Sequence, residues 1–331
     1  MIDKSTTINL DFIRELPIRF YTLPPIRVVY PFIIINLNRP NDGLRYIKKH
    51  YDKIESIIID SGIEVFKNGS KDYPGGYKTH TNRLVRMYYR VRSLCPNSEV
   101  YVTCPDYPDT FTPKQLWLSE EITNIERTVE SILWCTKKFR NVDWLIPLQV
   151  HYNRPDSIIR SIKLLVDSGF EFENYDYYAT PTKSRKVKDI VNLVLNCISE
   201  LRRYRKNFKL HLFGLYLKAV PEIVRLRFVN ISYDRGGLYS GTFNDVMRRG
   251  LLERYFSFDS SSYTKPVGDI VLKVVGAKKR FSCKSEVARV TYFLCYISRL
   301  CEMCNRYDFR DKILEILGIS RRDTSIESFF K

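Results

Sequence analysis

Short runs of β-branched and aromatic residues alternate along the chain with longer stretches in which apolar residues recur at helical spacing. PFIIINL at 31–37 precedes a helical pattern near 42–54, and ESIIIDSG at 55–62 precedes one near 80–94. Further strands are predicted at 99–106, 143–150, 175–181, 208–215, 227–234 and 255–262, with RFYTL at 19–23 as one more candidate. Further helices are predicted near 114–138, 155–168, 185–205, 217–226 and 242–252. This alternation is typical of βα units around a parallel sheet.

The number of strand candidates favours the α/β class and, within it, a closed (β/α)8 TIM barrel over an open sheet. No glycine-rich phosphate-binding motif opens any of the predicted helices, which argues against a nucleotide-binding fold. A length of 331 residues fits one barrel domain over 1–331. The pattern is helical again from about 285, so we expect 285–331 to form a C-terminal helical segment that covers the barrel.

The chain is strongly basic, with 54 Lys and Arg against 37 Asp and Glu, a net charge of +17. Basic residues cluster in LRRYRKNFK at 201–209 and in AKKRFSCK at 277–284. Charged helix faces are often simply solvated, but an excess of this size favours a polyanionic partner. We expect that partner to be nucleic acid, either DNA or tRNA.

No segment is apolar enough to predict a membrane span or a secretory signal. The longest aliphatic run, Phe32–Ile35, is far shorter than the roughly 18 residues that a spanning helix needs. The prediction is therefore a cytoplasmic protein without a membrane partner.

Eight cysteines are spread along the sequence, and in an intracellular protein they favour buried thiols over disulfides. Cys301 and Cys304 form a C-x-x-C pair, and Cys295 precedes it. No histidine follows, and a zinc site needs three or four converging ligands. These three cysteines are only weak zinc candidates.

The residues where the predicted strands end include several carboxylates and an amide on otherwise apolar strands. These positions are Asp60, Asp106, Gln149, Ala179 with Thr180, Gly214, Asp234 and Asp259. Taken singly, each reads equally well as a turn at the end of a strand. In a barrel, however, the carboxyl ends of all strands meet at one rim, where catalytic groups gather. Carboxylates buried there are unfavourable unless they are paired, hydrogen-bonded or functional.

Five stretches in order, IIIDSGIEVF, VTCPDYPD, IPLQV, LHLFGL and SFDSSSY, resemble the tRNA-guanine transglycosylases and their DNA-modifying DpdA-type relatives. The resemblance covers about 18–300, and LHLFG and FDSSSY are most similar to the archaeal branch. It implies exchange of a guanine in DNA or tRNA for a 7-deazaguanine such as preQ0. No redox or nucleotide cofactor is implied.

The resemblance also implies roles for the residues at the strand ends. Asp259 would be the nucleophile that attacks C1′ of the ribose, and Asp60 the acid and base that exchanges a proton with the base. Asp106 and Gln149 would bind the edge of the base, and Ala179 and Gly214 would line the pocket. The family's zinc subdomain follows its nucleophile, in the region of Cys295, Cys301 and Cys304, but with different cysteine spacing and a histidine.

Asp234 is a rival nucleophile, because the family's nucleophile usually follows the glycine at 214 by about one helix and one strand. If Asp259 is the nucleophile, 229–254 forms an insertion before its strand. Val150-His151 and Ala179 stand where glycine is common in the family, which predicts a reshaped base pocket.

Two other functions stay open. Water could reach C1′ and make the protein a hydrolytic N-glycosidase, or the barrel could be a catalytically inactive, basic nucleic-acid-binding protein. Whether it acts alone, as a homodimer or with a partner subunit also stays open.

Overall fold

The computed structural model describes residues 8–24, 28–108, 123–151, 154–182, 186–228, 230–234 and 293–316, apart from 295 and 299. The chain divides into two compact units. One comprises 17–24 and 32–235, and the other comprises 1–16, 25–31 and 236–331. Each unit is described by itself.

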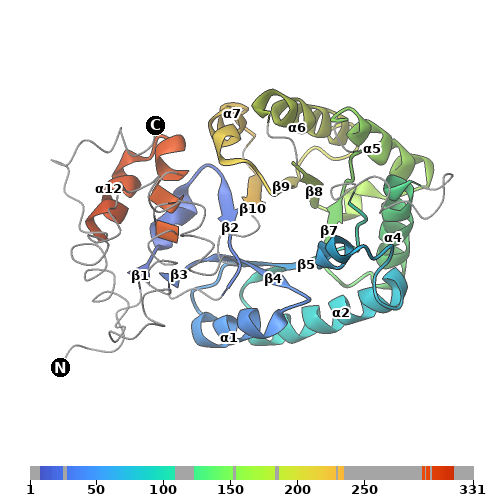
Figure 1. Ribbon diagram of the computed structural model, residues 1–331, viewed down its shortest axis with the longest axis horizontal. Helices are drawn as coiled ribbons and strands as arrows, with labels where there is room; N and C mark the ends of the chain where they lie inside the picture. The colour runs from blue at the N-terminus through green and yellow to red at the C-terminus, as the bar shows by residue number, and fades with distance from the viewer. Residues whose placement is uncertain are drawn as a thin grey trace. The chain divides into compact units, whose positions relative to one another are not determined.

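The larger unit is a (β/α)8 barrel of eight parallel strands, as predicted (Figure 1). Their order around the sheet is β2-β10-β9-β8-β7-β6-β5-β4. The bounds are β2 (Arg19–Tyr21), β4 (Phe32–Asn36), β5 (Ser56–Asp60), β6 (Glu99–Thr103), β7 (Trp144–Pro147), β8 (Tyr177–Pro181), β9 (Lys209–Phe213) and β10 (Ile231–Asp234). A parallel bridge between Thr22 and Ile33 joins the two ends of the sheet, with Ile34 N donating to Thr22 O at 2.8 Å.

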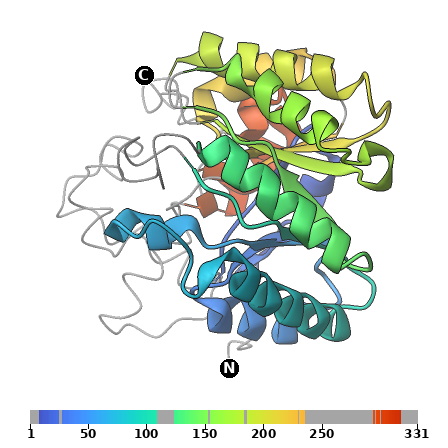
Figure 2. The ribbon, with the colours of Figure 1, turned by 90° about the vertical axis from the view of Figure 1, so that its right-hand side faces the viewer.

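Helices cover the outside of these strands (Figure 1). They are α1 (Pro40–His50), α2 (Gly76–Leu94), α4 (Asn124–Lys138), α5 (Ser157–Asp167), α6 (Val187–Leu201) and α7 (Val220–Arg225). Figure 2 shows α4, in green, between α2 and α5. Thr123 and Glu126 fix where α4 begins, because each side chain bonds the backbone of the other in a capping box. The strands are apolar on both faces because helices cover one face and the barrel interior the other.

The predicted strands and helices are confirmed wherever the structure describes them, and RFYTL supplies the first strand of the barrel. The eighth strand is Ile231–Asp234, inside the range 229–254 that the sequence suggested as an insertion. The barrel is thus closed without the strand expected at 255–262. That strand and the helix expected at 242–252 lie outside the described residues.

Paired charges occupy the amino-terminal end of the barrel. Lys209 Nζ lies 2.9 Å from Glu99 Oε1 and 2.6 Å from the hydroxyl oxygen of Tyr101, and Arg19 lies 3.7 Å from Glu99. These contacts join β2, β6 and β9 across the barrel. Lys209, Arg19 and Glu99 therefore each have a partner of opposite sign.

The smaller unit contains the parallel pair β1 (Ile8–Asn9) and β3 (Val28–Val29), the 3-10 helix η1 (Asp11–Glu15) and α12 (Tyr307–Ile316). Described residues between 293 and 303 are helical too, in agreement with the helical segment expected from 285. The rings of Phe12 and Phe309 lie 5.0 Å apart and join the two helices. Among the residues described, no helix is both long and apolar enough to cross a membrane.

Candidate active site at the carboxyl end of the barrel

Asp60 ends β5 and lies opposite Asn36, which ends β4. The Asn36 amide donates to Asp60 Oδ2 at 3.3 Å and to Glu64 Oε1 at 2.7 Å. Gly62 turns the chain between the two carboxylates with a φ of +80°. A side chain at Gly62 would meet the Asn38 amide nitrogen at 2.8 Å, so this turn requires glycine.

The surroundings of the Asp60 carboxyl shift it toward its protonated form. Burial raises its pKa well above the usual value, and the nearby carboxylates of Glu64, Asp106 and Asp234 raise it further. A hydrogen bond from the Gly62 backbone opposes this only in part. The side chain keeps some solvent exposure. Asp60 can therefore act as a proton donor that remains accessible.

Asp106 lies three residues beyond β6 and is buried, 6% exposed. The Ser61 hydroxyl donates to its Oδ1 at 2.7 Å, and the Gln149 amide donates to its Oδ2 at 3.2 Å. An ionised carboxylate offers about four acceptor positions, so a carboxylate can accept from more than two donors at once. Asp60, Asp106 and Gln149, which the sequence singled out separately, are brought together.

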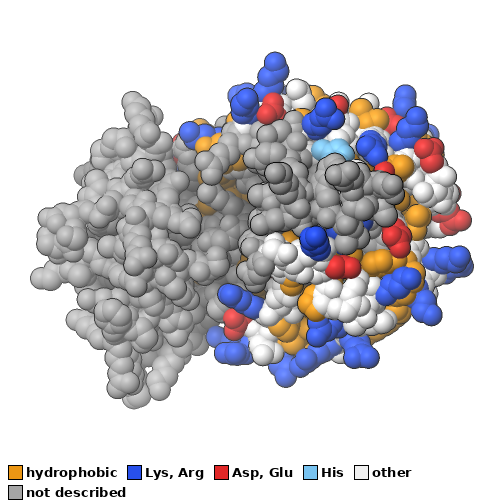
Figure 3. All heavy atoms as spheres, turned by 45° about the vertical axis from the view of Figure 1, so that its right-hand side comes forward, with side chains coloured by type: hydrophobic (Ala, Val, Ile, Leu, Met, Phe, Trp, Pro, Cys, Tyr) orange, Lys and Arg blue, Asp and Glu red, His pale blue; other side chains and the backbone are white. Residues whose placement is uncertain are grey.

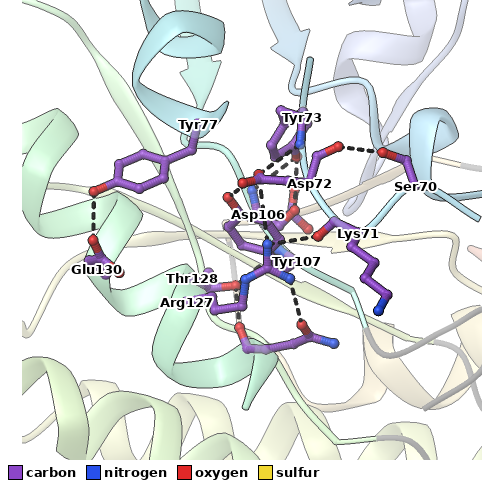
Figure 4. Close-up of polar contacts among 11 residues, drawn as sticks. Ser70, Lys71, Asp72, Tyr73, Tyr77, Asp106, Tyr107, Arg127, Thr128 and Glu130 are labelled. Atoms are coloured by element: carbon purple, nitrogen blue, oxygen red, sulfur yellow. Dashed lines mark hydrogen bonds and ion pairs between the residues drawn. The ribbon is translucent and has the colours of Figure 1, made fainter. Parts of the chain in front are cut away.

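Tyr73 holds the backbone of Asp106 from the loop before α2 (Figure 4). Its hydroxyl donates to the Asp106 carbonyl at 2.8 Å and accepts from the Asp106 amide at 3.2 Å. Its ring stacks on His80 at 4.1 Å, and His80 Nε2 lies 2.6 Å from the Ser61 carbonyl oxygen. Because a carbonyl only accepts, Nε2 carries the proton, and burial lowers the pKa of this histidine. His80 is thus a neutral, positioning side chain.

A buried arginine on α4 supports the same loop (Figure 4). Arg127 lies over the ring of Tyr107 at 3.6 Å and donates to the Lys71 carbonyl at 2.8 Å. Its ion pair with Asp72 is 3.7 Å long, and the Tyr107 hydroxyl donates to that carboxylate at 2.7 Å. The loop before α2 and the segment after β6 are therefore fixed to one cation.

Asp234 ends β10, the eighth strand. The Gly214 amide donates to its Oδ1 at 2.9 Å from a backbone with φ of +69°, and His211 Nε2 lies 3.4 Å from the same oxygen. His211 Nδ1 lies 2.9 Å from the Ser232 hydroxyl, which lies 2.6 Å from that of Tyr177. A chain of polar groups thus runs through the barrel interior to Asp234.

Amides and a histidine ring hold the carboxylates at this end of the barrel. Within the described part of the chain, no Lys or Arg lies within ion-pair distance of Asp60, Glu64 or Asp234. Their partners are asparagine amides, a backbone amide and the ring of His211. The amino-terminal end differs, since Glu99 is paired there with Lys209. Carboxylates concentrated without Lys or Arg partners are typical of a functional site.

Ala179 is placed differently from the other predicted residues. It is the third residue of β8, fully buried, and its carbonyl accepts from Leu148 N at 2.7 Å within the sheet. Its strand ends two residues later, so the structure does not bring Ala179 to the rim. Asp259 lies outside the described residues.

The described cysteines do not assemble a metal site. Burial raises the pKa of both Cys301 and Cys304 to about 12. Cys295 lies outside the described residues. Within the described ranges, no three His, Cys, Asp or Glu side chains are grouped so that they could hold a metal.

Several residues of this site were not predicted from the sequence: Asn36, Ser61, Glu64, Tyr73, His80, Arg127 and His211. Two of them carried a usable signal. Asn36 is a polar residue at the end of the apolar run PFIIINL, and His211 is a polar residue inside LHLFGL. The others contact the rim from loops or helices, whose course the apolar pattern does not predict.

Comparison with known proteins gives no family: no protein-family profile matches the sequence, and no curated protein matches it significantly.

Proposed function

We propose that the protein is a base-exchange transglycosylase that replaces a guanine in DNA or tRNA by a 7-deazaguanine. The observation that carries the proposal is the pairing of two carboxyl groups at one end of the barrel. Asp60 has a raised pKa and lies close enough to Asp234 for their charges to interact. Exchange at a glycosidic carbon needs these two functions, a proton donor and a nucleophilic carboxylate.

The reaction assigns one step to each group. A carboxylate oxygen of Asp234 attacks C1′ of the ribose, and the electron pair of the bond from C1′ to the base nitrogen passes to the leaving base. Asp60 protonates that nitrogen. The incoming base then gives its proton to Asp60 and attacks C1′, which releases the Asp234 carboxylate. The covalent ester protects the sugar from water between the two steps.

Asp234 takes the place of Asp259 as the proposed nucleophile. Asp234 ends the strand that completes the barrel, and its Oδ1 is oriented by the Gly214 amide at 2.9 Å. The sequence spacing from Gly214 also favours it, since one helix, α7, and one strand, β10, separate the two residues.

Asp106 and Gln149 are the proposed reading groups for the base. A guanine edge presents N1–H and an exocyclic amine, which can both donate to one carboxylate, and O6, which can accept a hydrogen bond from an amide. Gln149 uses one amide hydrogen on Asp106, which leaves its second hydrogen for O6. Asp106 and Gln149 are buried, so a base that fails to hydrogen-bond with them would leave a buried polar group unsatisfied. The pair would therefore discriminate strongly between guanine-like bases and others.

Incorporation of labelled guanine into tRNA or double-stranded DNA, counted as acid-insoluble label, tests the proposal. We expect label in one polymer, retained by Asp259→Asn and abolished by Asp234→Asn and Asp60→Asn. The control is Asp176→Asn, the same change at the amino-terminal end of the barrel, where Asp176 lies 3.9 Å from Lys209. A protein-polymer adduct that survives denaturation would report the ester.

Three results would contradict parts of this assignment. Loss of label in Asp259→Asn with full activity in Asp234→Asn would show that Asp259, and not Asp234, is the nucleophile. Release of free guanine without any incorporation would indicate the hydrolytic N-glycosidase. No incorporation and no release, with guanine or with preQ0, would favour the inactive nucleic-acid-binding barrel.

A further inference from the structure

Helix α2 is unlike the other α-helices whose bounds the structure gives. Its 19 residues include no Asp or Glu, whereas α1, α4, α5, α6, α7 and α12 each contain at least one. It carries five Lys and Arg instead: Lys78, Arg83, Arg86, Arg90 and Arg92. Figure 3 shows Lys and Arg side chains along the lower part of the described surface, where α1 and α2 lie in Figure 1, and also along its upper edge.

Burial divides α2 into two faces. Leu84, Val91 and other apolar side chains are buried, whereas Lys78, Arg83, Arg86 and Arg90 are exposed. Tyr89, 53% exposed, lies among these cations. From 78 to 90 the helix rises about 18 Å, at about 1.5 Å per residue. The outer face of α2 is therefore a continuous basic stripe with one exposed aromatic ring.

The arginines of this stripe have no carboxylate partner among the described residues. Arginines on other helices, or just beyond one, do: Arg45 pairs with Asp42, Arg203 with Glu200 and Arg225 with Glu222, each three residues away. The carboxylates beside α2 are engaged by tyrosine hydroxyls, Glu130 by Tyr77 and Asp143 by Tyr88, both at hydrogen-bond distance. The positive charge of the stripe is therefore available to a partner.

We propose that the outer face of α2 binds the phosphate backbone of the polynucleotide substrate. A strand of duplex DNA carries a phosphate about every 3.4 Å along the axis, so about 18 Å of helix can follow about five of them. An exposed tyrosine between cations can stack on a base or sugar. An anionic membrane fits less well, since a helix that lies in a membrane inserts an apolar face, and the apolar face of α2 is buried in the barrel unit.

The stripe begins beside the candidate active site. His80, in the second turn of α2, contacts the carbonyl of Ser61, the residue after Asp60. A polynucleotide bound along α2 would therefore reach the rim at the amino-terminal end of the helix. This link to catalysis rests on the proposed function, whereas binding of phosphates does not.

The test is the salt dependence of binding to duplex DNA and, separately, to bulk tRNA, for the full chain and two triple variants. Arg83→Gln, Arg86→Gln and Arg90→Gln together remove the three arginines of the stripe. Arg45→Gln, Arg203→Gln and Arg225→Gln together remove the same charge from paired positions. For the stripe variant we expect the slope of log K against log salt to fall by about 2 to 3, and affinity at about 0.1 M salt to fall at least about tenfold. The control should change little.

An equal loss in both triple variants would overturn the proposal, because net charge alone would then explain binding. Stronger binding to phosphatidylserine vesicles than to either polymer, lost in the stripe variant, would also overturn it in favour of a membrane. The experiment distinguishes failure of the proposed function from failure of the proposed binding surface. A stripe-dependent slope without any base exchange would reject only the proposed function, and base exchange with an unchanged slope would reject only this surface.

Discussion

Tyr73 holds Asp106 by its backbone and leaves the carboxylate to other partners. One hydroxyl group both donates to the Asp106 carbonyl and accepts from the Asp106 amide. Ser61 and Gln149 bond the two carboxylate oxygens. These two donors carry no charge, and they orient the side chain from both sides.

Tyr73→Phe should destabilise the protein by about 1 to 3 kcal/mol, because two buried backbone groups lose their partner. If Asp106 reads the base, the KM for the incoming base should rise more than kcat falls. Urea unfolding and exchange kinetics measure the two effects. Tyr77→Phe is the control, since its hydroxyl donates to Glu130 at the surface. Equal effects in the two variants would show that Tyr73 has no special role.

The strands could be predicted because each is determined by the apolar pattern within its own short run of sequence. A run such as PFIIINL is apolar at every position, which is typical of a strand covered on both faces, and its polar last residue marks the carboxyl end. Since parallel strands end at one rim, the sequence alone predicted that Asp60, Asp106 and Gln149 would meet. The same reasoning placed Asp234 at the end of a strand.

Contacts made from loops were not predictable in this way. Tyr73 reaches Asp106 across 33 positions of sequence, and Arg127 reaches the Lys71 carbonyl across 56. Such contacts depend on the course of the loop, which has no periodic pattern. Ala179 illustrates a different limit, since the strand 175–181 was predicted well but Ala179 lies two residues inside its end.

Asp60→Asn should stabilise the folded protein at neutral pH. The folded pKa lies above the unfolded one, so the wild-type group contributes stability at low pH and loses it as pH rises through the folded pKa. The variant should therefore gain stability over wild type as pH rises, by about 1.4 kcal/mol for each unit by which the pKa is raised. Denaturant unfolding from acid to neutral pH measures this. A gain that is constant with pH would contradict it.

Glu99→Gln makes the same kind of change as Asp60→Asn at the other end of the barrel, and we expect the opposite effect on stability. It removes the partner of Lys209 and Arg19 at the amino-terminal end, so it should destabilise the protein at neutral pH, by about 1 kcal/mol for this half-exposed carboxylate. Base exchange should continue. If Glu99→Gln abolished exchange and Asp60→Asn did not, the active end of the barrel would be the other one.

Arg127→Met should cost about 2 to 4 kcal/mol of stability, because the buried guanidinium bonds the Lys71 carbonyl, pairs with Asp72 and lies over Tyr107. Arg160→Met removes a surface ion pair with Glu126 at 2.7 Å and should cost less than about 1 kcal/mol. Thermal and urea unfolding compare the two. A coupling energy near zero in a double-mutant cycle of Arg127 with Tyr107 would show that the ring contact adds nothing.

Gly214 tests the orientation of Asp234 without removing any side chain. Its φ of +69° is unfavourable for other residues, and an added Cβ would meet nothing within 4 Å. Gly214→Ala should therefore cost about 1 to 2 kcal/mol through backbone strain alone, and Gly214→Asn less, because asparagine adopts this conformation more readily.

Gly169 has a φ of +73° and the same open surroundings. Gly169→Ala should cost as much stability as Gly214→Ala, but only Gly214→Ala shifts the amide that bonds Asp234 Oδ1. We expect base exchange to fall at least about tenfold in Gly214→Ala and to persist in Gly169→Ala. A tenfold fall corresponds to the loss of about one hydrogen bond to a carboxylate. Equal activity in the two variants would mean that the Gly214 amide does not orient the nucleophile.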